Sequence, residues 1–209
     1  MSQPVLFWDV DTQHDFMDAQ GRLPVPGACA IVDNLRRLTR AAIARHVPIV
    51  ASADSHPPDD PEFEQFGAHC VAGTQGQEKI IETQAEPAEV AVPAWVAEQV
   101  GRLASGELAQ LVLEKQELDV FSLPYADSVL DLLDPDHVFV YGVTTEYCVL
   151  QAVLGLRRHE RRVSVVTDAV RAIDEAEGRR ALDLMREAGV DFTDTDTVLQ
   201  SISKEAERR

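Results

Sequence analysis

Short apolar runs alternate with amphipathic segments along most of the chain, and this alternation leaves few folds open. The apolar runs are typical of buried strands and predict six of them, over residues 5–10, 47–51, 111–114, 138–141, 163–167 and 190–193. The amphipathic segments predict helices over residues 28–45, 94–108, 125–133, 146–158 and 175–188. Strands that alternate with helices form βαβ units. We therefore expect an α/β fold with a doubly wound, Rossmann-like sheet of about six parallel strands and helices on both faces.

The length and the loop signals predict how the chain is organised. A chain of 209 residues suits one domain, so we expect a single domain over residues 1–209. Prolines and glycines interrupt the stretch 55–109, which is less regular than the rest. Long irregular stretches between strands often carry function, so we expect a functional cap or loop region there.

The composition excludes several classes of protein. The formal net charge of −17 disfavours binding to nucleic acid, because the phosphate backbone is itself negative. Three cysteines cannot form a disulfide framework. The N-terminus lacks a secretory signal, and no apolar run approaches the ~20 residues that span a bilayer. We therefore expect a cytoplasmic protein with no membrane or nucleic-acid partner, and a homo-oligomer stays open.

Chemically useful side chains follow five of the expected strands. They are Asp11, Asp54, His56, Lys115, Cys148 and Asp168. Because ligands bind beyond the carboxyl ends of the strands in open parallel sheets, we expect these side chains to meet at one edge. The chain has no G-x-G-x-x-G, P-loop or G-x-S-x-G motif after a strand, which removes support for dinucleotide, phosphate-cradling and serine-hydrolase sites.

Cys148 is the candidate nucleophile. It follows a strand and falls in the first turn of the next expected helix, where free N–H groups lower the pKa of a thiol and can bind an oxyanion. Asp11 could remove the thiol proton, and Lys115 could hold that carboxylate in its ionised form. The alternatives are a buried structural cysteine and a structural Lys–Asp ion pair.

Two motifs resemble those of a known family. Residues 11–16, Asp-Thr-Gln-His-Asp-Phe, resemble the D-x-Q-x-D-F opening of the isochorismatase-like cysteine hydrolases, which include the nicotinamidases. Residues 142–149, Gly-Val-Thr-Thr-Glu-Tyr-Cys-Val, are similar to the nucleophile turn of that family. Lys115 occupies the place of the family lysine between them, and the resemblance extends over residues 5–199. The chain is thereby identified as a candidate member of the nicotinamidase-like branch.

The resemblance implies a role for each residue of these motifs. Cys148 would be the nucleophile, Asp11 the proton shuttle, and Lys115 the cation that orients Asp11. In the family a cis peptide precedes the residue that matches Thr144. The N–H groups of Thr144 and Cys148 would then form the oxyanion hole.

A second group of residues suggests a metal site. In Asp54-Ser55-His56 a carboxylate and an imidazole lie on the same side of an extended segment, and His69 could complete an open three-ligand site. On their own these residues are more typical of polar surface side chains than of a metal site. Together with the Gly-Thr-Gln-Gly run at 73–76 they resemble the nicotinamidase metal motif, which implies one divalent ion, zinc first, with iron or manganese as alternatives.

The metal loop departs from the family pattern. Many nicotinamidases have another histidine between the positions that match His56 and His69, and this chain has none there. Glu62 or Glu64 could supply a carboxylate in its place, or water could fill it. Ser55 stands where the family often has an aromatic residue, and the usual tryptophan before the second histidine is absent.

The resemblance also implies a substrate pocket and a reaction. Phe16 and Phe66 could sandwich an aromatic ring, and we expect Gln13, Val143 and Tyr147 to bind substrate as well. The expected reaction is hydrolysis of nicotinamide to nicotinic acid and ammonia through a thioester, a step of NAD salvage, with a metal-bound or metal-adjacent water as the second nucleophile. The alternatives are another small amide, a carbamoyl compound or an enol ether as substrate, or a catalytically silent binding protein.

Overall fold

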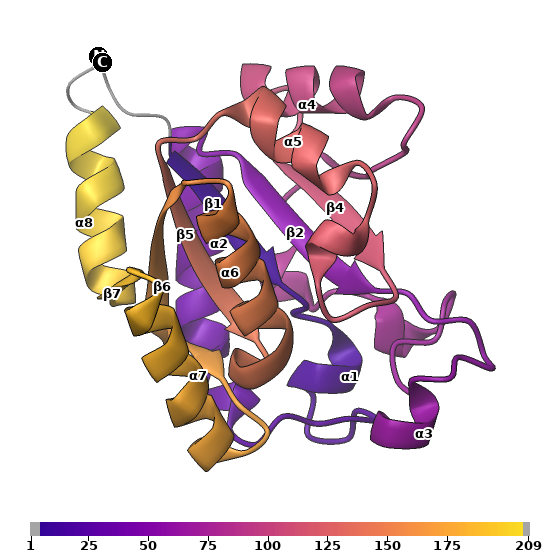
Figure 1. The fold of residues 1–209 in the computed structure, drawn as a ribbon. Coiled ribbons are helices and arrows are strands. Elements are labelled where there is room, and N and C mark those ends of the chain that lie inside the picture. The colour runs from indigo at the N-terminus through magenta and orange to yellow at the C-terminus, as the bar shows by residue number, and fades with distance from the viewer. Residues whose placement is uncertain (1–4, 207–209) are drawn as a thin grey trace.

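One parallel sheet runs through the middle of the molecule (Figure 1). The computed structural model describes residues 5–206. The sheet has seven strands in the order β3-β4-β2-β1-β5-β6-β7, and every neighbouring pair is parallel. The strands are β1 (Val5–Val10), β2 (Ile49–Asp54), β3 (Ala88–Val90), β4 (Gln110–Lys115), β5 (His137–Val143), β6 (Arg162–Arg171) and β7 (Asp191–Thr193). The predicted α/β class is therefore confirmed.

Helices cover both faces of the sheet (Figure 1). They are α1 (His14–Met17), α2 (Val32–Arg45), α3 (Phe63–Phe66), α4 (Val96–Ser105), α5 (Ala126–Leu133), α6 (Leu150–Arg158), α7 (Glu175–Glu187) and α8 (Thr195–Ala206). One apolar core joins α4, α5, α6 and α7 to one face of the sheet, and a second joins α1, α2 and α8 to the other. Alternate residues of β1 point into different cores, with Phe7 in one and Trp8 in the other. Burial on both faces explains why this strand reads as a continuous apolar run.

The structure extends or shortens most of the predicted elements. The second strand begins at Ile49, after Pro48, and continues to Asp54, so Asp54 ends the strand instead of following it. The predicted helix 146–158 is a π-helical turn, Thr145–Val149, followed by α6. The inserted helix 94–108 is confirmed as the shorter α4.

Neither β3 nor α8 was predicted, and neither were the one-turn helices α1 and α3. The three residues of β3 are too few to show a strand period. The helix α8 is mostly polar, and Val198 and Ile202, four residues apart, are the only apolar side chains buried in its described part. Both elements depend on their neighbours, since β3 pairs with β4 and α8 packs on α2 and β6.

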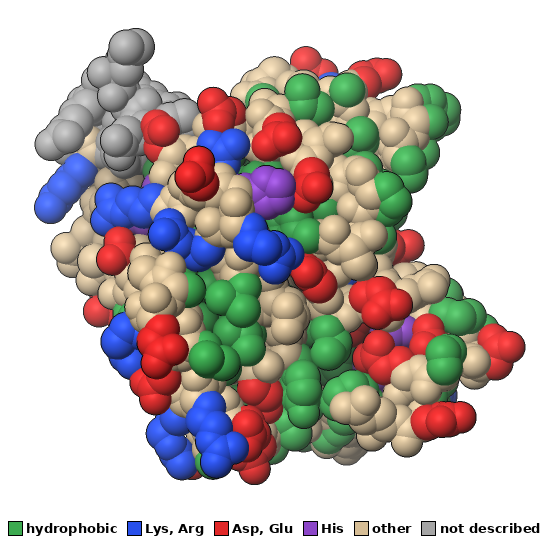
Figure 2. Space-filling view, in the orientation of Figure 1, with side chains coloured by type: hydrophobic (Ala, Val, Ile, Leu, Met, Phe, Trp, Pro, Cys, Tyr) green, Lys and Arg blue, Asp and Glu red, His purple; other side chains and the backbone are tan. Residues whose placement is uncertain are grey.

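Charged side chains of both signs are interspersed on the face seen in Figure 2. In the described part of the chain, several charged side chains pair with a residue three or four positions away, such as Arg180 with Glu177 and Arg186 with Asp183. The negative charge on this face is therefore spread over a solvated surface. Within the described part of the chain, no helix combines the length and the apolarity needed to cross a bilayer.

The sheet order brings the polar strand ends together. Strand β1 is central, with β2 on one side and β5 on the other, and the chain reaches these neighbours by connections on opposite faces. Such a switch in direction leaves a crevice at the carboxyl ends of the strands, where ligands bind in open α/β sheets.

Candidate active site

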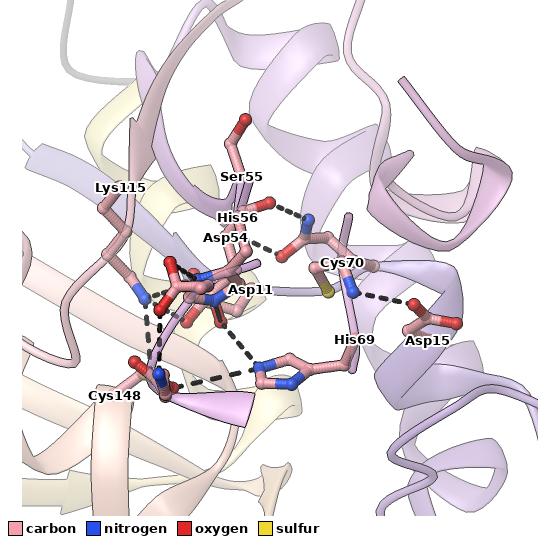
Figure 3. Close-up of polar contacts among 12 residues, drawn as sticks. Asp11, Asp15, Asp54, Ser55, His56, His69, Cys70, Lys115 and Cys148 are labelled. Carbon is pink, nitrogen blue, oxygen red and sulfur yellow. Dashed lines mark hydrogen bonds and ion pairs between the residues drawn. The ribbon is translucent and has the colours of Figure 1, made fainter. Parts of the chain in front are cut away.

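Asp11, Lys115 and Cys148 meet at this edge of the sheet (Figure 3). The Lys115 Nζ atom lies 3.0 Å from Asp11 Oδ2 and 3.4 Å from Cys148 Sγ. All three side chains are buried. Ser52 donates a hydrogen bond of 2.6 Å to Asp11 Oδ1 and so fixes the orientation of that carboxylate. The structure thus brings together a thiol, a carboxylate and an ammonium from three separate strand ends.

The same lysine also contacts Asp54, which ends β2 and pairs with Lys115 in the register of β2 and β4. Burial alone would lower the pKa of Lys115, but the carboxylates of Asp11 and Asp54 outweigh it and raise that pKa well above its ordinary value. Lys115 is therefore a fixed positive charge between two carboxylates. Burial would raise the pKa of Asp54, yet Lys115 and His56 lower it to about 2.

The position of Cys148 in the first turn of a helix led us to expect a lowered thiol pKa, and the structure gives the opposite direction. Burial raises the pKa of Cys148 well above its ordinary value, and Asp11 and Asp54 add to this although Lys115 opposes it. Burial also raises the pKa of Asp11, against the effect of Lys115. The thiol therefore keeps its proton at rest, beside a carboxylate whose affinity for a proton is higher than usual.

The turn that carries Cys148 lies directly beyond β5. The Val143–Thr144 peptide is cis, as the family resemblance implied, and the π-helical turn Thr145–Val149 follows. Gly142 has a φ of +117°, and a Cβ atom there would lie 2.0 Å from the carbonyl oxygen of Val10. Only glycine allows this close approach of β5 to β1, which is what sets the turn beside Asp11.

Asp54, His56 and His69 form a compact cluster of possible metal ligands. One ligand atom from each lies within 4.8 Å of the others, and all three side chains are buried. Asp54 Oδ2 is 3.8 Å from His56 Nε2 and 3.9 Å from His69 Nε2. The cluster thus uses the second oxygen of Asp54, while the first contacts Lys115. Asp54 therefore joins the possible metal ligands, which we call the metal cluster, to the group around Cys148, which we call the cysteine cluster.

The hydrogen bonds behind the two histidines fit a metal site. His56 Nδ1 lies 3.0 Å from Asp60 Oδ2, and His69 Nδ1 lies 2.8 Å from the carbonyl oxygen of Gly67. Partners of this kind orient the rings of metal-binding histidines, so that the Nε2 atoms face inward. His56 Nε2 is buried and lacks a hydrogen-bond partner in the described structure. A buried nitrogen without a partner is costly unless it binds a ligand, so the residues present fit a divalent metal ion.

Glu62 is better placed than Glu64 to add a carboxylate. Glu62 Oε1 lies 3.9 Å from His69 Nε2, and Glu62 lines the pocket. Burial near Asp54 raises the pKa of Glu62, although His56 and His69 oppose it. Glu64 is exposed.

Most of the predicted substrate-binding residues line one pocket above Cys148. Phe16, Phe66, Val143 and Tyr147 all contribute to it, together with Thr144. The structure adds three aliphatic residues that sequence reasoning missed: Leu23, Leu118 and Ile173. Each comes from a loop, after α1, β4 and β6, and no periodic pattern marks such positions.

Gln13 does not line the pocket. Its side chain is fully buried and hydrogen bonds to the backbone of Asp54 and of Gln77. The expectation that it binds substrate is corrected, since both polar atoms of its side chain hydrogen bond to backbone groups.

Asp168 also lies apart from the site. The sixth strand continues to Arg171, so Asp168 falls inside it, and its carboxylate accepts hydrogen bonds from Asn34 and Thr195. Of the other two cysteines, Cys29 is exposed and Cys70 is buried.

The chain thus combines an open parallel α/β sheet with a cysteine, a lysine and carboxylates that meet at the carboxyl ends of its strands. Residues 6–197 match the family model described as Isochorismatase domain. The chain belongs to the isochorismatase family. Its structure is similar to those of pyrazinamidase and nicotinamidase enzymes, as the resemblance of its two motifs predicted.

Two solved structures cover nearly the whole chain. The crystal structure of pyrazinamidase of Pyrococcus horikoshii in complex with zinc has a TM-score of 0.73 and 25% identity, over 91% of this chain and 99% of that chain. The structure of N-carbamoylsarcosine amidase from Thermoplasma acidophilum has a TM-score of 0.72 and 27% identity, over 93% and 97%. Isochorismatase family protein 1A of Dictyostelium discoideum is 28% identical over 88 residues, which are 40% of this chain and 43% of that protein. The match to this relative thus spans less than half of its length.

Proposed function

We propose that the chain is a metal-dependent cysteine amidohydrolase that cleaves small uncharged amides, with nicotinamide as the leading substrate. The observation that carries the proposal is the position of the Cys148 thiol. It lines the pocket, its Sγ atom is 3.4 Å from Lys115 Nζ, and a carboxylate oxygen of Asp11 lies within 4.8 Å of it. A buried thiol, a base and a fixed cation in contact are the parts that nucleophilic catalysis needs.

The first half of the reaction forms a thioester. Cys148 Sγ attacks the amide carbonyl carbon while its proton passes to Asp11, and the carbonyl electron pair moves onto oxygen. The N–H groups of Thr144 and Cys148 bind that oxyanion. The C–N bond then breaks, Asp11 returns the proton to the leaving nitrogen, and ammonia departs.

The second half releases the acid. Asp11 takes a proton from a water molecule as the water oxygen attacks the thioester carbon. The C–S bond then breaks, and Asp11 returns that proton to Cys148 Sγ, which restores the thiol and releases the acid. Lys115 stays charged throughout and keeps Asp11 in place. A divalent metal ion held by Asp54, His56 and His69, with Glu62 beside them, would act as a Lewis acid there and could bind water or a ring nitrogen.

The pocket lining supports an uncharged substrate. Its ionisable residues are Asp54, Glu62, His69 and Cys148, which all belong to the metal and cysteine clusters. The rest of the lining that the structure describes is aliphatic or aromatic apart from Thr144. Apart from the metal ion itself, the described pocket lining offers no lysine or arginine to pair with a substrate carboxylate, which would be buried next to Asp54 and Glu62. This disfavours an acidic carbamoyl compound, whereas the aromatic walls Phe16, Phe66 and Tyr147 suit a pyridine ring.

The test is ammonia release from nicotinamide by zinc-loaded protein. We expect turnover by the unchanged protein and by Cys29→Ser, which alters an exposed cysteine, and a loss of at least about 10³-fold for Cys148→Ala. Treatment with a chelator should lower the rate, and added zinc should restore it. Turnover of N-carbamoylsarcosine in preference to nicotinamide would contradict the substrate assignment. No reaction with any of a panel of small amides, together with a Cys148 no more reactive than Cys29 toward iodoacetamide, would favour a silent binding protein.

A further inference from the structure

We propose that Asp15 is a positioning residue for the metal site, and that it acts through the backbone of Cys70 to set the imidazoles of His69 and His56. The inference rests on the metal site of the proposed function. Asp15 itself binds neither metal nor substrate in this assignment.

The Asp15 carboxylate is buried, with 5% of the residue exposed, and both of its oxygens are engaged. Oδ2 accepts a hydrogen bond of 2.7 Å from the Cys70 N–H, and Oδ1 accepts one of 3.0 Å from the Arg22 N–H. Figure 3 shows Asp15 on the far side of Cys70 from His69, joined to the Cys70 backbone. Hydrogen bonds from backbone N–H groups to a carboxylate are stronger than those to a neutral acceptor.

Cys70 is the link between the two histidines of the cluster. It follows His69 directly, and its carbonyl oxygen accepts a hydrogen bond of 3.1 Å from the His56 N–H. The Ala72 N–H in turn donates to the His56 carbonyl oxygen at 2.9 Å. The backbone of Cys70 is therefore hydrogen-bonded to Asp15 through its N–H and to His56 through its carbonyl oxygen.

The backbone of Cys70 needs such a restraint. Its φ of +43° lies in the left-handed region, which is unfavourable for a residue with a side chain. This conformation sets the direction of the backbone before and after Cys70. A change in the φ of Cys70 would therefore move His69 relative to His56. The hydrogen bond to Asp15 opposes that change directly.

Gly76 packs against the same carboxylate and provides an independent way to disturb it. A Cβ atom at Gly76 would lie 2.1 Å from Asp15 Oδ2, although the φ of Gly76 is one that other residues can adopt. Alanine at this position must therefore displace the carboxylate from Cys70. A change at Gly76 should thus reproduce a change at Asp15.

The experiment measures zinc affinity by competition with a chromophoric chelator, on protein whose folding is checked by thermal unfolding. In Asp15→Asn one carboxylate oxygen becomes an amide donor, which cannot accept a backbone N–H. We expect zinc to bind about 10- to 100-fold more weakly to Asp15→Asn and to Gly76→Ala, the loss typical of removing a group that orients a ligand. The double variant should lose little more than either single one, since both act on the same contact.

Asp168→Asn is the matched control. Its carboxylate also accepts a backbone N–H, that of Thr195, in a part of the fold away from the pocket lining. We expect this variant to bind zinc within about twofold of the unchanged protein, whatever its thermal stability. Affinities of Asp15→Asn and Gly76→Ala within that same range would overturn the inference, and so would an equal loss in Asp168→Asn. An unchanged protein that binds neither zinc, iron nor manganese would overturn the metal site itself, and this inference with it.

Discussion

The side chain of Gln13 binds the backbone of Asp54 on both sides. Gln13 Nε2 donates to the Asp54 carbonyl oxygen at 2.8 Å, and the Asp54 N–H donates to Gln13 Oε1 at 2.7 Å. A pair of antiparallel residues exchanges the same two hydrogen bonds in a sheet. Gln13 thus continues the hydrogen bonding of β2 at Asp54. The carboxylate of Asp54 contacts Lys115 and lies close to the two histidines.

Replacement of Gln13 should therefore reduce both stability and activity. Gln13→Leu removes these hydrogen bonds and a third to the carbonyl oxygen of Gln77, and leaves buried backbone groups unpaired. We expect the free energy of unfolding to fall by about 2–4 kcal/mol, and the amidase rate to fall by at least about tenfold. Chemical denaturation and ammonia release measure the two effects. Gln200→Leu, at an exposed position of α8, should change neither by much.

Lys115 carries the charge balance of the site. Lys115→Met would leave the buried carboxylates of Asp11 and Asp54 without their shared cation, so the free energy of unfolding should fall by about 3–5 kcal/mol and activity should be lost. Adding Asp11→Asn to this variant removes one of the two unpaired charges. The double variant should regain part of the stability in urea unfolding, with no recovery of ammonia release. A double variant less stable than Lys115→Met would contradict this charge balance.

Gly142 should tolerate no side chain. In Gly142→Ala the new Cβ would lie 2.0 Å from the Val10 carbonyl oxygen, at a φ that favours glycine. We expect a loss of about 3 kcal/mol or more in the free energy of unfolding, or no soluble protein. Gly101 in α4 is the matched control, because a Cβ there meets nothing within 4 Å. Gly101→Ala should leave stability unchanged or raise it by up to about 1 kcal/mol.

His137, at the start of β5, should make stability depend on pH. Burial, with Arg162 nearby, lowers its pKa to about 4, whereas an unfolded histidine titrates near 6.5. The unfolded chain thus binds the proton more tightly, so stability is full above pH ~6.5 and falls as the pH drops toward ~4. We expect this group to account for about 1–2 kcal/mol of that fall, after allowance for solvent screening.

The measurement is urea unfolding at pH 7.5, 6 and 4.5. Stability of His137→Asn should decline less than that of the unchanged protein over this range. His46→Asn, at an exposed position, should follow the unchanged protein. Equal slopes for the unchanged protein and His137→Asn would rule out the role of His137.

Much of the fold was predictable because its signals are local. The apolar strand runs, the amphipathic face of α2 and the alternation of strands with helices all appear within short windows of sequence. The rule that ligands bind at the carboxyl ends of parallel strands then predicted that Asp11, Asp54 and Lys115 would converge. Asp168 was the exception, because β6 is longer than its apolar run and carries that residue past the point where a strand end was expected.

The remaining features depend on contacts between segments far apart in the chain. The sequence by itself determined the α/β class, the order of the strands along the chain and the polar residues at their ends, since these follow from local hydrophobic patterns. Only the tertiary structure decided that Gln13 supports Asp54 instead of facing substrate, that Leu23, Leu118 and Ile173 wall the pocket, and that the Cys148 thiol keeps its proton. Burial, the distance between charges and the pairing of buried polar groups govern these properties, and each of them is set by neighbours that folding alone brings into contact.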